Sequence, residues 1–246
     1  MIRNTFIILE GIGLKKEKQL WASGIKAWND FLSATSIKGI TKQKKEKYDW
    51  QLEEAKQKLW TGNTSYFSEK LPMPEHWRLW DHFREEAGFL DIETGSYDGI
   101  TIVGLYDGKE TKTLIKGRTL DRQTLLQELN KFAIIVSFNG AAFDIPSLEK
   151  YFGFKLKIPH IDLRTVCKRL GYSGGLKKIE SAMGIIRRKE VEGLLGGHAD
   201  QLWNLWNTSG DSEWLERLVM YNEEDTINLK TLAEKTIPVL KEKVLA

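Results

Sequence analysis

Apolar residues follow two different spacings along this chain, and the change falls near residue 88. Before it, apolar residues recur every three or four positions among charged ones, which is typical of helices. The helices expected from this spacing are a short apolar one before Gly11 and further ones at about residues 15–23, 41–60 and 75–86. Gly24 and Gly62 fall where two of them should end. The first part of the chain is therefore expected to be all-helical.

After residue 88 the pattern indicates strands. The expected strands are Phe89–Glu93, Thr101–Tyr106 and Lys112–Lys116, an antiparallel meander, followed by a buried strand at Phe132–Phe138. Helices are expected at Asp121–Asn130 and Ile145–Tyr151. Strands followed by alternating strands and helices predict an α/β fold with a mixed central sheet flanked by helices. We expect three units, covering residues 1–35, a helical connector at 36–88, and the α/β domain at 89–246.

Two acids stand two positions apart in the first expected strand. Side chains at i and i+2 of a strand share one face, so Asp91 and Glu93 should project together while Leu90 and Ile92 enter a core. Two like charges held side by side are unfavourable unless a cation lies between them. Carboxylates are the ligands that Mg²⁺ and Mn²⁺ prefer, so the pair indicates a metal site. The alternative is an edge strand that exposes both acids to water.

Two later segments carry further acids. Asp144 follows the buried strand and precedes a helix, a position that on its own is typical of an N-cap. Tyr221 and Asp225 are four residues apart on an expected helix and share a stripe that is otherwise apolar. An Asp on such a stripe needs a partner, because burying an unpaired charge is costly.

Composition narrows the class of protein. The 246 residues are 41% hydrophobic, enough for a substantial core. The net charge of +3 is too small to indicate nucleic-acid binding by itself, although residues 1–88 carry all of the excess. One cysteine, Cys167, excludes an internal disulfide and fits a reducing compartment. Neither a signal peptide nor a membrane span is visible, so we expect a cytoplasmic protein without a membrane partner.

The N-terminal pattern around Gly11-Ile12-Gly13 resembles a helix-hairpin-helix motif. In that motif the glycines let backbone amides approach a phosphate, and the following helix adds its positive end. Lys15 lies in the first turn of the expected second helix, which suits a bound polyanion. The alternative is a glycine-containing turn in a helical hairpin. The resemblance implies sequence-independent nucleic-acid binding.

The acids match a known order. Asp91-x-Glu93, Asn139-Gly140-x3-Asp144 and Tyr221-x3-Asp225 resemble the acidic signature of the DEDD 3′–5′ exonucleases, and the Tyr indicates the DEDDy subclass. Further similarity to the YprB-type RNase H-like family, relatives of the exonuclease domain of family-B DNA polymerases, lies in Phe89–Thr94, His160–Leu163 and Leu176–Glu180. The resemblance covers residues 89–230. It implies an RNase H-like fold preceded by a small all-α region.

This resemblance implies a metal-dependent 3′–5′ exonuclease that acts on single-stranded ends of nucleic acid, with DNA favoured over RNA. Two Mg²⁺ or Mn²⁺ ions would be its cofactors. Asp91 would bridge both ions, Glu93 and Asp225 would complete the site of the water-activating ion, and Asp144 would support the second. Tyr221 would orient or deprotonate the attacking water.

Several residues are candidates for contact with the substrate. They are Thr94, Asn139, Phe143 and Lys177 in the α/β domain, and Gly11, Gly13 and Lys15 in the N-terminal motif. Lys177 belongs to a basic group with Lys178, Arg187, Arg188 and Lys189, which is either a binding patch or an ordinary surface. Asn139 is either a substrate contact or a turn-forming residue. His160 is expected to be structural. Asp162 is expected to be structural as well, and the alternative is an acid that supports the metal ligands.

Two other functions stay open on this pattern. A protein that keeps the fold without catalysis could bind nucleic acid or act as a scaffold, although such a site usually loses at least one acid. A structure-selective endonuclease could use the same metal site. Cleavage of circular DNA separates the endonuclease from the exonuclease, since it needs no free end.

Overall fold

A mixed five-stranded sheet forms the centre of the molecule, with strand order β3-β2-β1-β4-β5. The computed structural model describes residues 1–191 and 196–246. The strands are β1 (Ala87–Gly95), β2 (Gly99–Tyr106), β3 (Thr111–Ile115), β4 (Ile134–Ser137) and β5 (His160–Asp162). The first three pair antiparallel, while β4 runs parallel to β1 and β5 parallel to β4. The expected mixed sheet is therefore confirmed.

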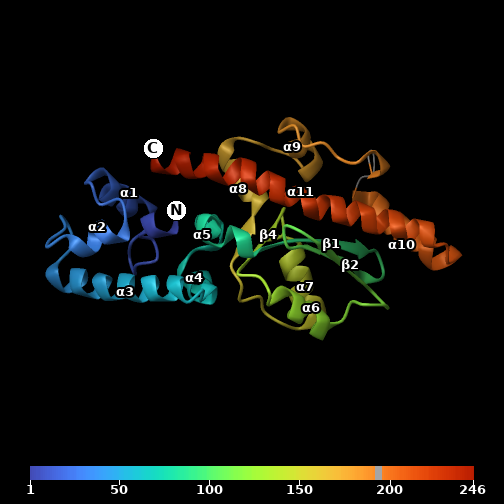
Figure 1. Cartoon of the computed structure of the whole chain (residues 1–246), viewed down its shortest axis with the longest axis horizontal. Helices are drawn as coiled ribbons and strands as arrows, with labels where there is room; N and C mark the ends of the chain where they lie inside the picture. The colour runs from blue at the N-terminus through green and yellow to red at the C-terminus, as the bar shows by residue number, and fades with distance from the viewer. Residues whose placement is uncertain (192–195) are drawn as a thin grey trace.

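Helices cover both faces of this sheet (Figure 1). The helices of this part are α6 (Arg122–Leu129), α7 (Asp144–Phe152), α8 (Leu163–Leu170), α9 (Leu176–Ala182), α10 (Gly196–Ser209) and α11 (Ser212–Leu245), with a 3-10 turn, η4, at Lys189–Val191. Alternate residues of β1 face opposite ways, as expected for a strand. Leu90 and Ile92 pack in one cluster with residues of α6 and α7. Asp91 and Glu93 face the long helix α11.

Helix α11 lies unusually close to the sheet at Gly104. This glycine of β2 is paired with Asp91 of β1. A Cβ atom at Gly104 would lie 2.0 Å from Asn222 Oδ1 and 2.7 Å from Thr226 Oγ1, both on α11. Real Cβ contacts are never that short, so only glycine permits this approach. The close packing places α11 within reach of the acids on β1.

The N-terminal region is helical but begins differently from the expectation. Its helices are α1 (Leu14–Ala22), α2 (Trp28–Ser33), α3 (Lys42–Trp60) and α4 (Thr64–Lys70). The short apolar helix expected before Gly11 is wrong: that segment holds only a 3-10 turn, η1, at Ile2–Asn4 and then irregular turns. All four residues from Phe6 to Leu9 are buried. A surface helix would bury only one of its faces, so a non-helical backbone suits this run better.

The helix expected at residues 75–86 is also wrong. The segment is divided into η2 (Met73–Leu79), a single α-helical turn α5 (Trp80–Phe83) and η3 (Arg84–Glu86). Trp77, Trp80 and Phe83 are all buried and follow one another at intervals of three residues. That interval is the period of a 3-10 helix, whereas an α-helix repeats every 3.6 residues.

A buried ion cluster anchors the start of the chain. Arg78 has no exposed surface, and its guanidinium contacts Glu17 Oε2 at 2.9 Å and Glu75 Oε2 at 2.6 Å. Arg169 on α8 reaches Glu75 Oε1 at 2.9 Å. Glu17 also accepts hydrogen bonds from two backbone N–H groups of the irregular segment before α1. We call these four residues the Arg78 cluster.

The N-terminal helices and the sheet share one continuous hydrophobic core. It runs from Phe6 and Phe31 through Val136 of β4 to Leu232 and Leu240 of α11. In Figure 1 the C-terminal part of α11 extends from the sheet toward the N-terminal helices. The unit boundaries expected near residues 35 and 88 stay predictions. Within the described part of the chain, no helix has both the length and the apolar character needed to cross a membrane.

Candidate active site

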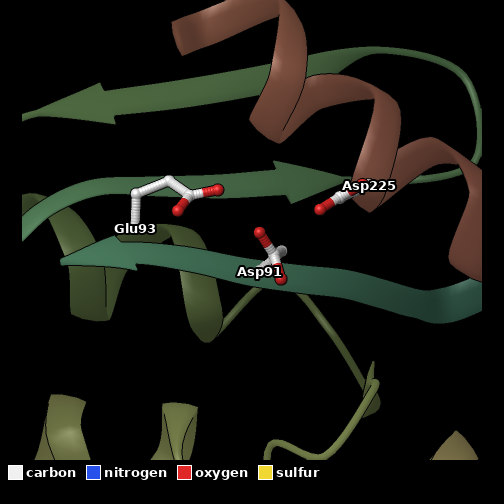
Figure 2. Close-up of side chains that lie close together, drawn as sticks. All are labelled: Asp91, Glu93 and Asp225. Atoms are coloured by element: carbon white, nitrogen blue, oxygen red, sulfur yellow. The ribbon is translucent and has the colours of Figure 1, made fainter. Parts of the chain in front are cut away.

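Three acids from two elements meet above the sheet. Asp91 and Glu93 project from β1 and Asp225 projects from α11 toward them (Figure 2). One carboxylate oxygen from each lies within 4.8 Å of those of the other two. The expected shared face of Asp91 and Glu93 is therefore confirmed, as is the buried stripe of α11 that carries Tyr221 and Asp225. We call Asp91, Glu93 and Asp225 the acidic cluster.

Asp144, the fourth expected acid, adjoins this cluster without belonging to it. It is the first residue of α7, and the N-cap position is occupied by Phe143, so the N-cap interpretation is wrong. Its Oδ1 accepts a hydrogen bond from the N–H of Ile92, at 3.2 Å, between the two acids of β1. Burial raises the pKa of Asp144 to about 7. Its charge also contributes to raising the pKa of Asp91.

The electrostatics of the acidic cluster favour a bound cation. Burial, followed by repulsion from neighbouring carboxylates, raises the pKa of Asp91 and of Glu93 well above their usual range. Asn222 of α11 donates a hydrogen bond from Nδ2 to Asp91 Oδ2, at 2.8 Å, which offsets only part of this cost. A set made of carboxylates alone suits Mg²⁺ or Mn²⁺, whereas structural zinc sites use Cys and His. The residues present therefore fit the divalent ions expected from the sequence.

Two cations border the acidic cluster. Arg187 Nη1 lies 2.5 Å from Asp225 Oδ1, and its Nε donates to the buried Glu180 of α9 at 2.6 Å. Lys177, also on α9, donates to the hydroxyl of Tyr221 at 3.1 Å and lies 4.3 Å from the centre of its ring. These contacts tie α9 and the segment before η4 to α11.

Tyr221 lies one helical turn before Asp225 and is almost fully buried. Burial, reinforced by the charges of Asp225, Glu93 and Asp91, raises the pKa of its hydroxyl. The hydroxyl accepts the hydrogen bond from Lys177, and the negative charges of these three acids act on it. The structure thus brings the Tyr of the motif to the cluster, as the sequence predicts.

Two members of the basic group that includes Lys177 form ion pairs within the protein. Arg187 pairs with Glu180 and Asp225, and Arg188 pairs with Glu224 of α11 at 2.5 Å. Sequence spacing gave no sign of these pairs, because the partners lie 7 to 38 residues away and meet only in the folded chain.

Asn139 occupies a strained position at the end of β4. Its φ of 65° lies in the left-handed region, uncommon for residues other than glycine. Its N–H donates to Asp162 Oδ1 at 2.8 Å, and its Oδ1 accepts from Arg164 at 2.6 Å. Asp162 also caps α8, as expected for a structural residue. His160 is buried with its Nε2 2.7 Å from Ser137 Oγ, as is also expected for a structural residue.

The other expected substrate contacts fall into two groups. Thr94 is half-buried directly after Glu93 on β1, and Phe143 is 44% exposed directly before Asp144. Gly11, Gly13 and Lys15 are exposed around the start of α1, in the N-terminal region rather than beside the acidic cluster. Gly11 and Gly13 line an open groove of about 550 Å³.

Three residues of the site carry no role in the sequence prediction. Asn222 holds Asp91, Gly104 admits α11, and Glu180 anchors Arg187. The only sequence signal for Asn222 is its place beside Tyr221 in the motif. A glycine in the middle of an apolar strand is the signal for Gly104, since it often marks close approach of another backbone or side chain.

Comparison with known proteins agrees with this geometry. A model of the RNase_H superfamily matches residues 88–237, so the chain belongs to that superfamily. A search of curated proteins found no match.

Among solved structures, a family B DNA polymerase from the hyperthermophilic archaeon Pyrobaculum calidifontis is similar, with a TM-score of 0.51 and 17% sequence identity. The match covers 65% of this chain and 27% of the polymerase chain, so the present chain corresponds to only a part of that protein. At this identity the likeness concerns the fold.

Proposed function

We propose that this protein is a DEDDy-type 3′–5′ exonuclease that removes nucleotides from single-stranded ends, with DNA preferred over RNA. The observation that carries the proposal is the meeting of Asp91, Glu93 and Asp225 within 4.8 Å, with Tyr221 one helical turn from Asp225. RNase H superfamily membership and the fold likeness to a family B polymerase support it.

The proposed chemistry is hydrolysis of a phosphodiester bond. Two divalent ions, Mg²⁺ or Mn²⁺, held by such a site lower the pKa of an attacking water and neutralise charge on the phosphate. In this chain the acidic cluster supplies the ligands, and Asp144 adds negative charge beside Asp91. Asn222 keeps the carboxylate of Asp91 in one orientation through its hydrogen bond.

Tyr221 orients the attacking water in this proposal. Its hydroxyl is fixed by the hydrogen bond from Lys177, so its remaining hydrogen-bonding capacity can point toward the acidic cluster. Thr94, Asn139, Phe143 and Lys177 are proposed to contact the end of the substrate strand. The groove at Gly11 and Gly13, together with Lys15 in the first turn of α1, would be an accessory grip for nucleic acid.

The test is degradation of a 5′-labelled single strand, with DNA and RNA in parallel. Reactions contain Mn²⁺ or EDTA, and the variants are Asp91→Asn, Tyr221→Phe and the control Glu216→Gln, an exposed position on α11. We expect a ladder that shortens from the 3′ end, abolished by EDTA. Asp91→Asn should lose at least about 10³-fold in rate, equivalent to about 4 kcal/mol of barrier. Tyr221→Phe should lower kcat about 10- to 100-fold.

Other outcomes would favour one of the alternative functions. Cleavage of a circular strand, which has no end, would favour the structure-selective endonuclease. A wild-type protein that binds the strand with Mn²⁺ present but leaves it intact would favour the binding or scaffold protein. Equal rates for Asp91→Asn and Glu216→Gln would contradict the proposed site.

A further inference from the structure

A cleft lies at the end of β4, where Asn139 contributes to its lining. It encloses about 480 Å³ between the end of β4, the helix α8 and the loop that leads to α9. The residues used below are Asn139, Arg164, Lys168, Tyr172 and Ile179, all of which line it. We call it the α8 cleft.

The α8 cleft carries a positive charge. Arg164 and Lys168 are one turn apart on α8, so their side chains project from the same exposed face of the helix. Asp162 is the acid that also lines the cleft, but its two carboxylate oxygens already accept N–H groups from Asn139, Ala141 and Arg164. The two cations are therefore the groups offered to a ligand, and they match a polyanion.

An aromatic side chain lines the same cleft as these cations. Tyr172 is 38% exposed, and its backbone N–H donates to the carbonyl of Cys167 at 3.0 Å, which fixes the residue at the end of α8. Aromatic rings next to basic residues are the usual means of binding single-stranded nucleic acid, because bases stack on the ring while cations contact phosphates.

Two elements connect the α8 cleft to the candidate active site. In the parallel register of β1 and β4, Phe89 pairs with Val136, so Asp91 is level with the residue just before Asn139. Helix α9 contributes Ile179 to the cleft and Lys177 to the hydroxyl of Tyr221. A strand in the cleft would therefore lead toward the acidic cluster.

We propose that the α8 cleft binds the single nucleic-acid strand whose end lies at the acidic cluster. Lys168 and Arg164 contact its phosphates, and Tyr172 stacks on one of its bases. Arg164 has a second task, because its hydrogen bond holds the side-chain oxygen of Asn139 and leaves the amide N–H groups of Asn139 as donors toward the strand. The assignment deepens the proposed nuclease function and rests on it for the direction of the strand.

The experiment measures strand binding without catalysis. Fluorescence anisotropy with a 5′-labelled oligothymidylate of ten nucleotides, in EDTA, gives Kd at several salt concentrations. The variants are Lys168→Glu and Tyr172→Ala, with Lys150→Glu, at another exposed lysine on α7, as the control. All three positions are exposed, so the fold should tolerate the changes.

We expect Lys168→Glu to raise Kd at least about tenfold and to reduce the dependence of log Kd on log salt by about one phosphate contact. Tyr172→Ala should raise Kd about tenfold with the salt dependence unchanged, since stacking releases no counterions. Lys150→Glu should stay near the wild-type value. In Mn²⁺, the loss caused by Lys168→Glu should fall on KM more than on kcat.

Three results would overturn the proposal. They are wild-type Kd values for both cleft variants, an equal loss for Lys150→Glu, and a wild-type protein that binds no strand even at low salt. Failure of the nuclease proposal gives a different result. In that case the strand binds with the expected dependence on Lys168 and Tyr172, while the hydrolysis assay shows no product.

Discussion

Two buried groups of charged residues in this molecule differ in their balance of charge. The Arg78 cluster contains two acids and two cations, and each acid contacts an arginine directly. Glu17 is further satisfied by two backbone N–H groups. Burial still raises the pKa of Glu17, although the Arg78 charge opposes the shift. This cluster is electrically complete, and its role is to join α1, η2 and α8.

The acidic cluster lacks that balance. With its neighbours Asp144 and Glu180 it brings five acids together, bordered by the two cations Arg187 and Lys177. Repulsion from the other acids adds to burial in raising the pKa of Asp91 and of Glu93. The Arg78 cluster has as many cations as acids, whereas the acidic cluster has fewer cations than acids. Bound metal cations would supply the missing positive charge in the acidic cluster. The comparison teaches that burial of acids alone does not indicate a metal site, whereas an uncompensated excess does.

Removing Arg78 from the balanced cluster should have the largest effect on stability. Arg78→Met leaves Glu17 and Glu75 buried without their main partner, so we expect a loss of about 3–5 kcal/mol in the free energy of unfolding. The control is Arg84→Met, which removes an exposed ion pair with Glu85 and should cost less than about 1 kcal/mol. Urea unfolding of both variants gives the comparison. Similar losses for the two would contradict the structural role of the Arg78 cluster.

His160 is buried and kept neutral, in contrast to the charged residues of the two clusters, and it should make the stability depend on pH. Burial lowers the pKa of His160 to about 4 from its usual 6.5, with nearby His76 acting in the same direction and Asp162 opposing it. Between these values the unfolded chain binds a proton that the folded chain does not. The free energy of unfolding should therefore fall as pH decreases from 6.5 to 4, by at most about 3 kcal/mol from this residue.

Urea unfolding across this pH range isolates the contribution of His160 by comparison of variants. His160→Gln should flatten the decrease, and His82→Gln, at an exposed position, should leave it intact. A wild-type slope in His160→Gln would show that other groups cause the decrease.

The close packing of α11 against Gly104 allows a test of how the geometry of the acidic cluster is maintained. Gly104→Ala would force the new Cβ against Asn222, which holds Asp91. We expect a cost of about 1–3 kcal/mol from overpacking, together with reduced hydrolysis because the acids move apart. Gly13→Ala is the control for the unfolding measurement, since no atom lies within 4 Å of a Cβ at that position, and the exposed Glu216→Gln is the control for strand cleavage. Unfolding and strand cleavage should both be measured, and an unchanged rate would separate the packing from the site.

Removing one acid from the unbalanced cluster should have the smallest effect and the opposite sign. Asp91→Asn keeps an oxygen that can accept the hydrogen bond from Asn222 but removes a charge that its neighbours repel. In EDTA at pH 7 we expect a gain of about 1 kcal/mol in the free energy of unfolding, a size typical of relieving an unfavourable functional group. Thermal unfolding in EDTA checks it, and a loss of stability would mean that the acids are already balanced.

Much of the site could be predicted because its determinants are local. The face shared by Asp91 and Glu93 follows from the period of a strand, and the stripe of Tyr221 and Asp225 follows from the period of a helix. Both were confirmed, as was the mixed sheet. The chain order of the acids added the expectation that the two segments would meet.

The remaining features depend on contacts between distant segments. The pairing of Arg187 with Asp225 joins residues 38 positions apart, and the irregular start of the chain is stabilised by Glu17 and Arg78. The α8 cleft combines the end of β4 with α8 and the following loop. Local periodicity contains no information on contacts between segments that are distant in the sequence. The helix predicted at residues 75–86 was wrong for another reason, because the interval of three residues between its apolar side chains was interpreted as α-helical.

The most direct test of the uncompensated acidic cluster is titration of the purified protein with Mn²⁺ by isothermal calorimetry, in a chelator-free buffer. We predict saturable binding by the wild type that is lost or strongly weakened in Asp91→Asn and retained in Glu216→Gln. Binding that is absent in the wild type, or equal in all three proteins, would contradict the account of the acidic cluster as a site for divalent cations.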